Sequence, residues 1–287
     1  ALAIAKGAKG VGLYRTEYFF LTRSELPSED QQVEAYTEVL HELAPETVIF
    51  RTLDIGGDKF ASYLGAGTSE LNPFLGWRGI RFLLTRHDIF RTQLRAFLRA
   101  STAGKLKIMF PMVTGLEEVR QAQALVAEVR RDLEAEGFAY DRQIEIGIMI
   151  ETPAAVAIAD LLARECDFFS IGSNDLIQYT LAVDRGNARI SYLYEPMHPS
   201  ILRLIRNTVE AGHAHGIWVG MCGEVAGDPL YSVLLVGLGL DELSISAYMI
   251  PEVKRIIRSI TYDEAKSLVR RAMGLATAAE IRKLVAS

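Results

Sequence analysis

Short apolar runs alternate with longer amphipathic stretches along the whole chain, and this alternation limits the folds that the chain can adopt. The predicted strands cover residues 11–14, 48–50, 107–112, 144–151, 167–171, 218–222 and 242–246. Strands that alternate with helices form a parallel sheet, because each helix carries the chain back to the start of the next strand. A length of 287 residues suits a (β/α)8 barrel of the TIM type. We therefore predict an α/β barrel that forms a single domain over residues 1–287.

A complete barrel of this type has one strand more than the sequence predicts. Residues 1–9 have the pattern of the end of a helix, and Gly10 is a helix stop with no strand before it. We therefore expect that the chain as given lacks the first strand of the barrel.

Composition excludes several classes of protein. The net charge of -5 gives no indication of binding to nucleic acid or to an anionic membrane. The longest apolar runs are too short to span a bilayer, and the first residues have no signal-peptide pattern. Two cysteines, Cys166 and Cys222, do not form a disulfide framework, so we expect a reducing, cytoplasmic setting.

Helix boundaries are indicated by capping boxes, in which a Ser or Thr is followed three residues later by Glu or Gln. These pairs are Ser28 and Gln31, Thr114 and Glu117, Thr261 and Glu264, and Thr277 and Glu280. We also predict one helix over residues 78–99.

A carboxylate follows the fourth predicted strand directly. Glu151 stands at the end of a buried apolar run, with Thr152 as a possible N-cap and Pro153 at the first helical position. In parallel α/β folds, chemistry collects just beyond the carboxyl ends of the strands. Glu151 is therefore a candidate metal ligand.

Other predicted strands also end on polar side chains. The set consists of Arg15, Arg51, Glu151, Asn174 with Asp175, and Cys222. A barrel brings these ends to one face, where two carboxylates with waters suit Mg²⁺. Arginines offer paired donors to phosphate or carboxylate. The strand ends together predict a metal-assisted site for a small phosphorylated acid.

Each of these residues also has a structural interpretation when it is taken alone. An arginine such as Arg15 or Arg51 is more often a salt-bridge partner than a phosphate ligand. Glu151 could simply interact favourably with a helix N-terminus. A single Cys222 would more often be a small buried apolar residue. The combination of strand ends favours the functional interpretation.

Several motifs, in order along nearly the whole chain, resemble those of enzyme I of the bacterial phosphotransferase system. They lie at residues 10–17, 51–59, 72–78, 107–112, 147–155, 170–175, 182–187 and 220–224. The resemblance is to the C-terminal, phosphoenolpyruvate-binding domain of that family. Pyruvate phosphate dikinase and phosphoenolpyruvate synthase share the barrel and several motifs, and the run 178–187 is more similar to enzyme I.

The resemblance implies a role for each strand-end residue. Glu151 and Asp175 would bind Mg²⁺, which also contacts the substrate. The phosphoryl group would be held by Arg15, Arg51 and Arg185. Positioning of the substrate would fall to Arg78, Lys59 and Asn174. Cys222 would protonate the pyruvate enolate, since a thiol can donate a proton near neutral pH.

The family's phosphoryl-accepting histidine lies in a separate N-terminal domain, in a Thr-Ser-His type of motif that none of the five histidines here occupies. We therefore expect a fragment that binds phosphoenolpyruvate but needs a histidine domain for transfer. The resemblance also implies a downstream phosphocarrier protein as partner, and a homodimer.

Three other functions remain open from the sequence. The chain could be the matching domain of a dikinase or synthase. It could also be a barrel lyase that uses a pyruvate enolate on Mg²⁺. The third possibility is a non-catalytic dimerisation fragment.

Overall fold

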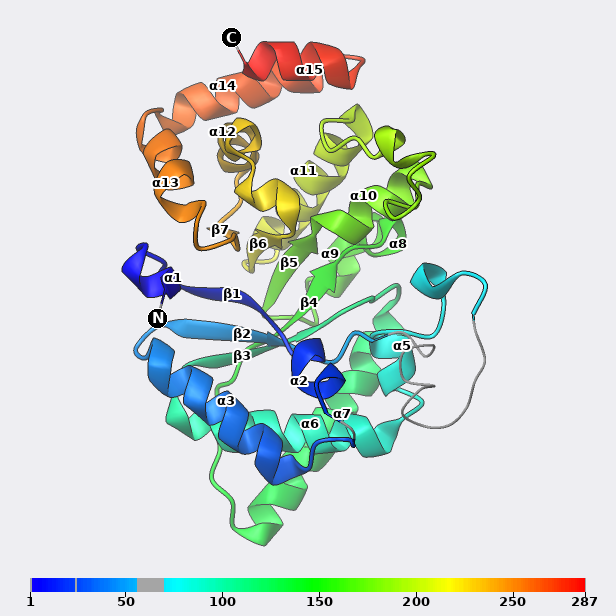
Figure 1. Cartoon of the computed structure of the whole chain (residues 1–287), viewed down its shortest axis with the longest axis vertical. Coiled ribbons are helices and arrows are strands. Elements are labelled where there is room, and N and C mark those ends of the chain that lie inside the picture. Colours follow the sequence, from blue (N-terminus) through cyan, green and yellow to red (C-terminus); the bar gives the residue numbers. More distant parts are fainter. Residues whose placement is uncertain (1, 24, 56–69, 287) are drawn as a thin grey trace. The chain divides into compact units, whose positions relative to one another are not determined.

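The computed structural model describes residues 2–23, 25–55 and 70–286, and its strands follow one another in chain order (Figure 1). They are β1 (Gly10–Arg15), β2 (Thr47–Arg51), β3 (Leu106–Phe110), β4 (Ile146–Ile150), β5 (Phe168–Gly172), β6 (Trp218–Cys222) and β7 (Glu242–Leu243). Their pairing is parallel from β1 to β4 and again from β5 to β7. All seven predicted strands are present, which confirms the α/β fold of TIM-barrel type.

The chain divides into two compact units. The N-terminal unit is Lys9–Ile148, and the C-terminal unit is Met149–Ser287 together with Ala1–Ala8. That both act as a single domain stays a prediction.

The N-terminal unit is built around a buried group of aromatic rings. Its helices are α2 (Glu17–Leu21), α3 (Glu29–Leu43), η1 (Pro73–Leu75), α5 (Ile80–Leu83), α6 (His87–Ala100), η2 (Ser101–Ala103) and α7 (Leu116–Glu136). Helices α3, α6 and α7 lie along one side of strands β1–β3 (Figure 1). The Tyr36 ring centroid lies 5.2 Å from that of Phe50 and 4.8 Å from that of Phe97, and all three side chains are fully buried. These rings join α3, β2 and α6 in one core.

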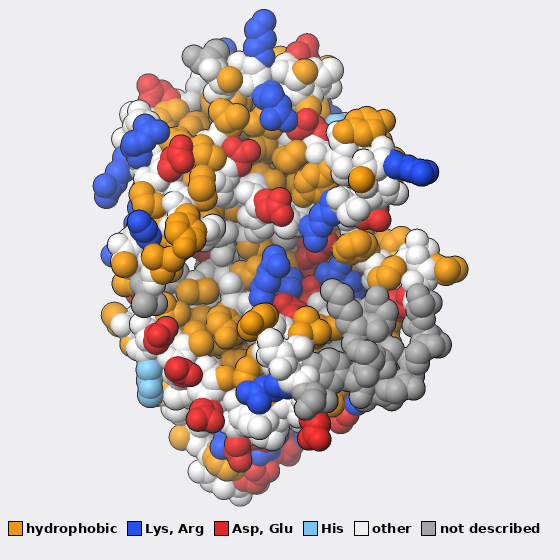
Figure 2. Space-filling view, viewed as in Figure 1, with side chains coloured by type: hydrophobic (Ala, Val, Ile, Leu, Met, Phe, Trp, Pro, Cys, Tyr) orange, Lys and Arg blue, Asp and Glu red, His pale blue; other side chains and the backbone are white. Residues whose placement is uncertain are grey.

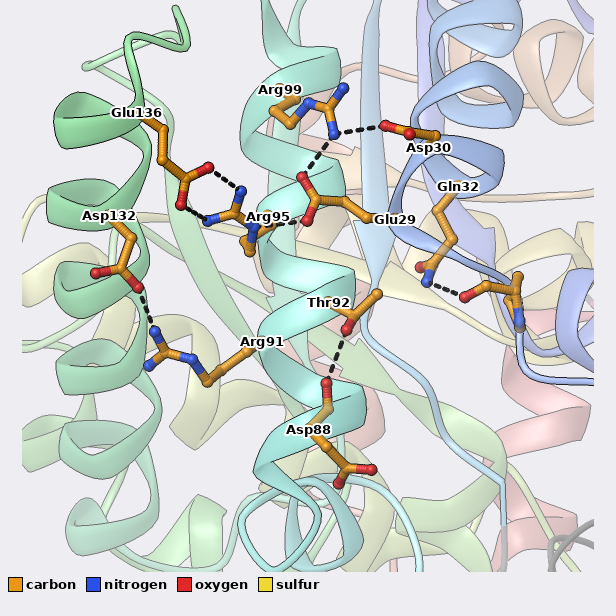
Figure 3. A network of polar contacts seen from close by, with 11 residues as sticks. Glu29, Asp30, Gln32, Asp88, Arg91, Thr92, Arg95, Arg99, Asp132 and Glu136 are labelled. Atoms are coloured by element: carbon orange, nitrogen blue, oxygen red, sulfur yellow. Dashed lines mark hydrogen bonds and ion pairs between the residues drawn. The ribbon is translucent and has the colours of Figure 1, made fainter.

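Ion pairs connect α6 to both neighbouring helices (Figure 3). Arginines stand at every fourth position of α6, so they share one face of the helix. Arg95 pairs with Glu29 of α3 and with Glu136 of α7, each at 2.6 Å. Arg99 pairs with Glu29 at 2.6 Å, and Arg91 pairs with Asp132 of α7. The three helices are thereby linked on the outside as well as through their core.

The C-terminal unit packs its helices closely through small residues. These helices are α1 (Leu2–Ala5), α8 (Pro153–Ala157), α9 (Ala159–Leu162), α10 (Ser173–Leu181), η3 (Ser191–Leu193), α11 (Pro199–Ala214), η4 (Glu224–Gly227), α12 (Pro229–Leu238), α13 (Ile250–Arg258), α14 (Tyr262–Met273) and α15 (Ala278–Val285). A Cβ at Gly237 of α12 would lie 2.3 Å from the Ala265 carbonyl oxygen of α14, so only glycine permits this approach. Trp218 of β6 stacks on Phe168 of β5 with ring centroids 4.6 Å apart.

Most predicted helix starts are confirmed, and two predictions are wrong. Capping boxes are present at Ser28, Thr261 and Thr277. The box predicted from Thr114 and Glu117 is wrong by one residue, because the next acid, Glu118, accepts from the Thr114 and Gly115 backbone N–H groups. The helix predicted over 78–99 is two helices, α5 and α6. The Thr85 hydroxyl between them donates to the Phe82 carbonyl oxygen, a side-chain bond typical of helix ends.

Among the described residues, none of the helices combines the length and the apolar character that a membrane span needs. Large apolar side chains are exposed in both units, and Figure 2 shows hydrophobic side chains scattered over the visible face. Tyr18, Leu71, Tyr192 and Tyr248 are the most exposed of them. Scattered exposure of this kind is normal in globular proteins, so it does not indicate a partner.

Candidate functional site

Two of the predicted arginines end neighbouring strands. Arg15 is the last residue of β1 and Arg51 the last of β2, and their Cα atoms are partners in the strand register. Paired strands lie about 4.8 Å apart, so these residues begin from adjacent points of the sheet. The Arg15 side chain is exposed and Arg51 is buried. The structure thus brings these two residues together, as the sequence predicted.

Two carboxylates hold the arginines in this unit. Asp54 lies 3.2 Å from Nη1 of Arg51 and accepts from Nε and Nη2 of Arg78 at 3.0 and 2.6 Å. Glu17 lies 3.1 Å from Nη2 of Arg51 and accepts from the Asp54 backbone N–H at 3.0 Å. Arg78, from the loop before α5, therefore joins Arg51 through a shared carboxylate. Lys59, also predicted here, lies outside the described residues.

Asp54 stays ionised inside this cluster. Burial raises the pKa of the Asp54 carboxyl, but the charge of Arg51, the hydrogen bond from Arg78 and the charge of Arg15 together lower it below its ordinary value. The cluster contains three arginines and two carboxylates, Asp54 and Glu17, which leaves an excess of one positive charge. Such a cluster can attract an anion and offer it guanidinium donors.

In the C-terminal unit, Glu151 is held just beyond β4. Its side chain is buried, and Thr152 behind it caps α8 by accepting from the Ala155 N–H at 3.1 Å, as predicted. A Cβ at Gly172, the last residue of β5, would lie 2.7 Å from Oε2 of Glu151 and 2.9 Å from the sulfur of Met149. The Glu151 carboxylate therefore occupies space that a side chain at Gly172 would fill.

Asp175 and Arg185 are neighbours in the same unit. Asp175 is a buried residue in the first turn of α10, and its Oδ1 lies 3.7 Å from Nη2 of Arg185. The left-handed residue Ala182, with a φ of 53°, ends α10, and the chain then leads to Arg185. Gln178 of α10 accepts from the Arg185 backbone N–H at 3.2 Å. Helix α10 thus carries the Asp175 carboxylate and, through Gln178, also holds the backbone of the neighbouring Arg185.

Asn174 and Cys222 are joined through the strand pair β5–β6. The Ser173 hydroxyl donates to the Cys222 carbonyl oxygen at 3.0 Å, and Asn174 Oδ1 accepts from the Glu224 N–H at 3.1 Å. Cys222 is buried and forms no disulfide. Between these bonds, Gly223 has a φ of 103°, and a Cβ there would lie 2.3 Å from the Ser173 hydroxyl oxygen. Glycine is required at this turn.

Tyr194 lies beside these residues, although no pattern in the sequence indicated it. Its hydroxyl lies 3.5 Å from the Asn174 carbonyl oxygen. Burial, helped by the charges of Glu224 and Asp175 and opposed by the charge of Arg185, raises the pKa of Tyr194 to about 12. The hydroxyl therefore stays protonated and can donate a hydrogen bond. Glu17 and Asp54 were also missed as partners, yet each follows a strand-end arginine by two or three residues, which is a usable signal.

The carboxylates of the C-terminal unit suit a hard divalent cation. Within the described part of the chain, no group of three or more His, Cys, Asp or Glu side chains could hold a metal ion. Glu151 and Asp175 provide oxygen donors alone, and both are buried. Each is the kind of oxygen ligand that Mg²⁺ takes from proteins, since Mg²⁺ needs only one or two carboxylates and keeps several waters.

The chain is similar to proteins of known class. A family model described as "PEP-utilising enzyme, PEP-binding domain" matches residues 1–262. Phosphoenolpyruvate-protein phosphotransferase of Haemophilus influenzae is 52% identical over 279 residues, which cover 97% of this chain and 48% of that protein. The protein of that name from Staphylococcus aureus is 53% identical over 282 residues, covering 98% and 49%. The chain thus spans about half the length of the curated relatives it matches.

Solved structures of low identity share the fold. A Haloferax volcanii malate synthase in a lead(II) complex matches with a TM-score of 0.53 and 14% identity, over 80% of this chain and 59% of that one. A citrate lyase of Burkholderia xenovorans matches with a TM-score of 0.50 and 16% identity, over 91% and 88%. At such identities the likeness extends to the fold alone.

Proposed function

Since the chain belongs to the family of PEP-utilising enzymes and matches their PEP-binding domain, we propose that it binds phosphoenolpyruvate with Mg²⁺ for phosphoryl transfer to a protein histidine. The identity of 52–53% to phosphoenolpyruvate-protein phosphotransferases is the observation that carries this proposal. It also confirms the resemblance drawn from the motifs. The relatives' names favour this enzyme class over a dikinase or synthase.

The arginine cluster of the N-terminal unit supports binding of the phosphoryl group. In the proposal, Arg15 and Arg51 donate to phosphoryl oxygens, and Arg78 and Lys59 orient the substrate. The net positive charge of the cluster favours a phosphate ester, and guanidinium groups stabilise charge that develops during transfer. The carboxylates Asp54 and Glu17 keep the arginines in place before substrate arrives.

The C-terminal unit supplies the remaining groups of the proposal. Glu151 and Asp175 would hold Mg²⁺, which when bound would supply positive charge that stabilises phosphoryl and enolate oxygens. Arg185 donates to the phosphoryl group, and Asn174 positions the substrate. Nη2 of Arg185 lies 3.7 Å from Oδ1 of Asp175, so the carboxylate that would hold the cation and the guanidinium that would bind the phosphate are neighbours.

The reaction proposed is a transfer followed by a protonation. The bond between phosphorus and the enol oxygen breaks, its electron pair stays on that oxygen, and a phosphorus–nitrogen bond forms on a histidine of another domain. The thiol of Cys222 then gives its proton to the methylene carbon of the enolate, which becomes pyruvate. The thiolate takes back a proton from water. Cys222 is the last residue of β6, so a rigid strand holds its sulfur.

The proposed function also implies partner proteins, an oligomeric state and a cellular compartment. We propose that a histidine domain and a downstream phosphocarrier protein complete the transfer to sugars, and that the active form is a homodimer. Two buried cysteines that form no disulfide, Cys166 and Cys222, fit the reducing conditions of a cytoplasm. Sedimentation velocity across a range of concentrations tests the dimer, and a monomer throughout would contradict it.

Calorimetry with phosphoenolpyruvate tests the binding proposal. The chain should bind phosphoenolpyruvate in the presence of Mg²⁺, and chelation of the cation should remove binding. Glu151→Gln should also lose Mg²⁺-dependent binding, because it replaces a charged oxygen ligand with a neutral amide of the same size. Glu210→Gln, an exposed acid of α11, serves as the matched control. Equal binding with and without Mg²⁺ would overturn the metal assignment.

A further inference from the structure

One buried side chain joins the segments that follow β1 and β2. Gln93 of α6 has no exposed surface. Its Oε1 accepts from the Leu53 backbone N–H at 2.9 Å, and its Nε2 donates to the Thr16 hydroxyl oxygen at 3.2 Å. A backbone N–H can only donate, so the orientation of the Gln93 amide is fixed. The Thr16 hydroxyl in turn donates to the Arg51 carbonyl oxygen at 3.0 Å.

These bonds fall directly beside the charged cluster. Thr16 follows Arg15 in sequence, and Leu53 precedes Asp54. Both residues are distant from Gln93 in the sequence: Thr16 is 77 residues away and Leu53 is 40 residues away. Beyond its last ladder bond a strand end has no sheet partner, so the backbone there depends on side chains for its conformation. Gln93 holds the Leu53 backbone N–H after β2 and the Thr16 side chain after β1.

A second buried glutamine completes the network on the side away from the strand ends. The Tyr36 hydroxyl lies 3.5 Å from Nε2 of Gln93 and donates to Oε1 of Gln32 at 3.0 Å. Gln32 also donates to the Pro27 carbonyl oxygen at 3.2 Å (Figure 3). Burial raises the pKa of Tyr36 well above its ordinary value, so its hydroxyl keeps its proton.

We propose that Gln93 is a positioning residue for phosphoryl binding: it fixes the strand-end backbone from which Arg15 and Arg51 reach the substrate. This inference rests on the proposed function. A hydrophobic residue at position 93 would leave the Leu53 N–H and the Thr16 hydroxyl without this partner in a dry interior. Both groups would then move toward other partners, and the arginines would move with them.

The test compares two buried glutamines of one network. Gln93→Leu and Gln32→Leu each remove an amide from a side chain that is at most 1% exposed. Gln32 bonds to Pro27 and Tyr36, both outside the strand ends. Both variants should unfold at lower urea concentration. Affinity for phosphoenolpyruvate with Mg²⁺, measured by calorimetry on the folded chain, should fall by about tenfold or more in Gln93→Leu alone, as misplacement of binding groups does.

A second measurement does not depend on any ligand. Exchange of the Leu53 amide hydrogen should be faster in Gln93→Leu than in Gln32→Leu. If Gln93→Leu does not fold, Thr16→Val removes the part of the link that runs from Gln93 through Thr16 to the Arg51 carbonyl oxygen, at nearly constant volume, and should show the same selective loss of affinity. Equal affinity and equal Leu53 exchange in the variants would overturn the inference. No binding by the unaltered chain would instead overturn the proposed function, and Leu53 exchange would still decide whether Gln93 fixes the strand end.

Discussion

Replacing Asp54 with asparagine removes one negative charge from the arginine cluster and keeps the shape of the side chain. Asp54 accepts from Arg78 at 3.0 and 2.6 Å and lies 3.2 Å from Arg51. Its side chain is 1% exposed, so water cannot take the place of the lost charge. Removing one partner of a buried ion pair costs about 3–5 kcal/mol, and we expect a loss of that size in the free energy of unfolding.

Asp88→Asn is the matched control, because Asp88 accepts the same fork from Arg86, at 2.9 and 2.6 Å. The Asp88 side chain is 63% exposed, and an exposed pair contributes less than about 1 kcal/mol. Urea unfolding followed by circular dichroism gives both free energies. Equal losses in the two variants would refute the reasoning that burial sets the cost.

The same variant has an expected pH dependence. Burial raises the pKa of Asp54, but Arg51 and Arg78 lower it by more, so the folded value lies below the ordinary 3.8. A carboxyl with a lowered folded pKa stabilises the protein fully above its unfolded pKa, and this contribution is lost as the pH falls through the folded value. The stability difference between the unaltered chain and Asp54→Asn should be constant near neutral pH and shrink below about pH 4. A difference that grows on acidification would contradict this.

Two further changes test other parts of the molecule. Gly172→Ala places a Cβ 2.7 Å from Oε2 of Glu151, so stability should fall by about 1–3 kcal/mol and Mg²⁺-dependent binding should weaken. Gly227→Ala is its control, because a Cβ there meets its nearest neighbour at an ordinary 3.6 Å; equal losses in urea unfolding would contradict the steric argument. Arg95→Met should lower the free energy of unfolding by about 1 kcal/mol at low salt and by less in 0.5 M NaCl, since salt screens ion pairs. Arg142→Met, at a 77% exposed side chain, should change little at either salt concentration, and a salt-independent loss in Arg95→Met would count against its ion pairs.

Strands were well predicted because their signal is local. The strand Trp218–Cys222 was predicted with the bounds that the structure has. A short, mostly apolar run that ends at a glycine is typical of a buried strand. Capping was harder at the start of α7. Glu117 and Glu118 are adjacent acids, and the sequence alone does not show which of them accepts from the backbone N–H groups of Thr114 and Gly115. The backbone geometry at Gly115, the N-cap of α7, selects Glu118.

The strand-end positions of the candidate residues were predicted, but the contacts that these residues make were not. That strand ends carry Arg15, Arg51, Glu151 and Cys222 follows from strand assignment. The pairing of Arg51 with Asp54 and Glu17 does not follow, because an arginine side chain is long and can reach several acids. Such choices depend on burial and on competing partners, which a single sequence does not state.

In both units, a buried glutamine accepts a hydrogen bond from a backbone N–H group at or near a candidate arginine. Gln93 accepts from the Leu53 N–H beside one arginine, and Gln178 accepts from the Arg185 N–H itself. Backbone donors just beyond a strand or helix end need an acceptor, and a neighbouring helix is rigid enough to hold one. A buried aspartate or glutamate could also accept, but its negative charge would offset that of the neighbouring arginine. An uncharged amide satisfies the backbone and leaves the charge of the arginines for the ligand, so glutamine meets both requirements where an acid meets one.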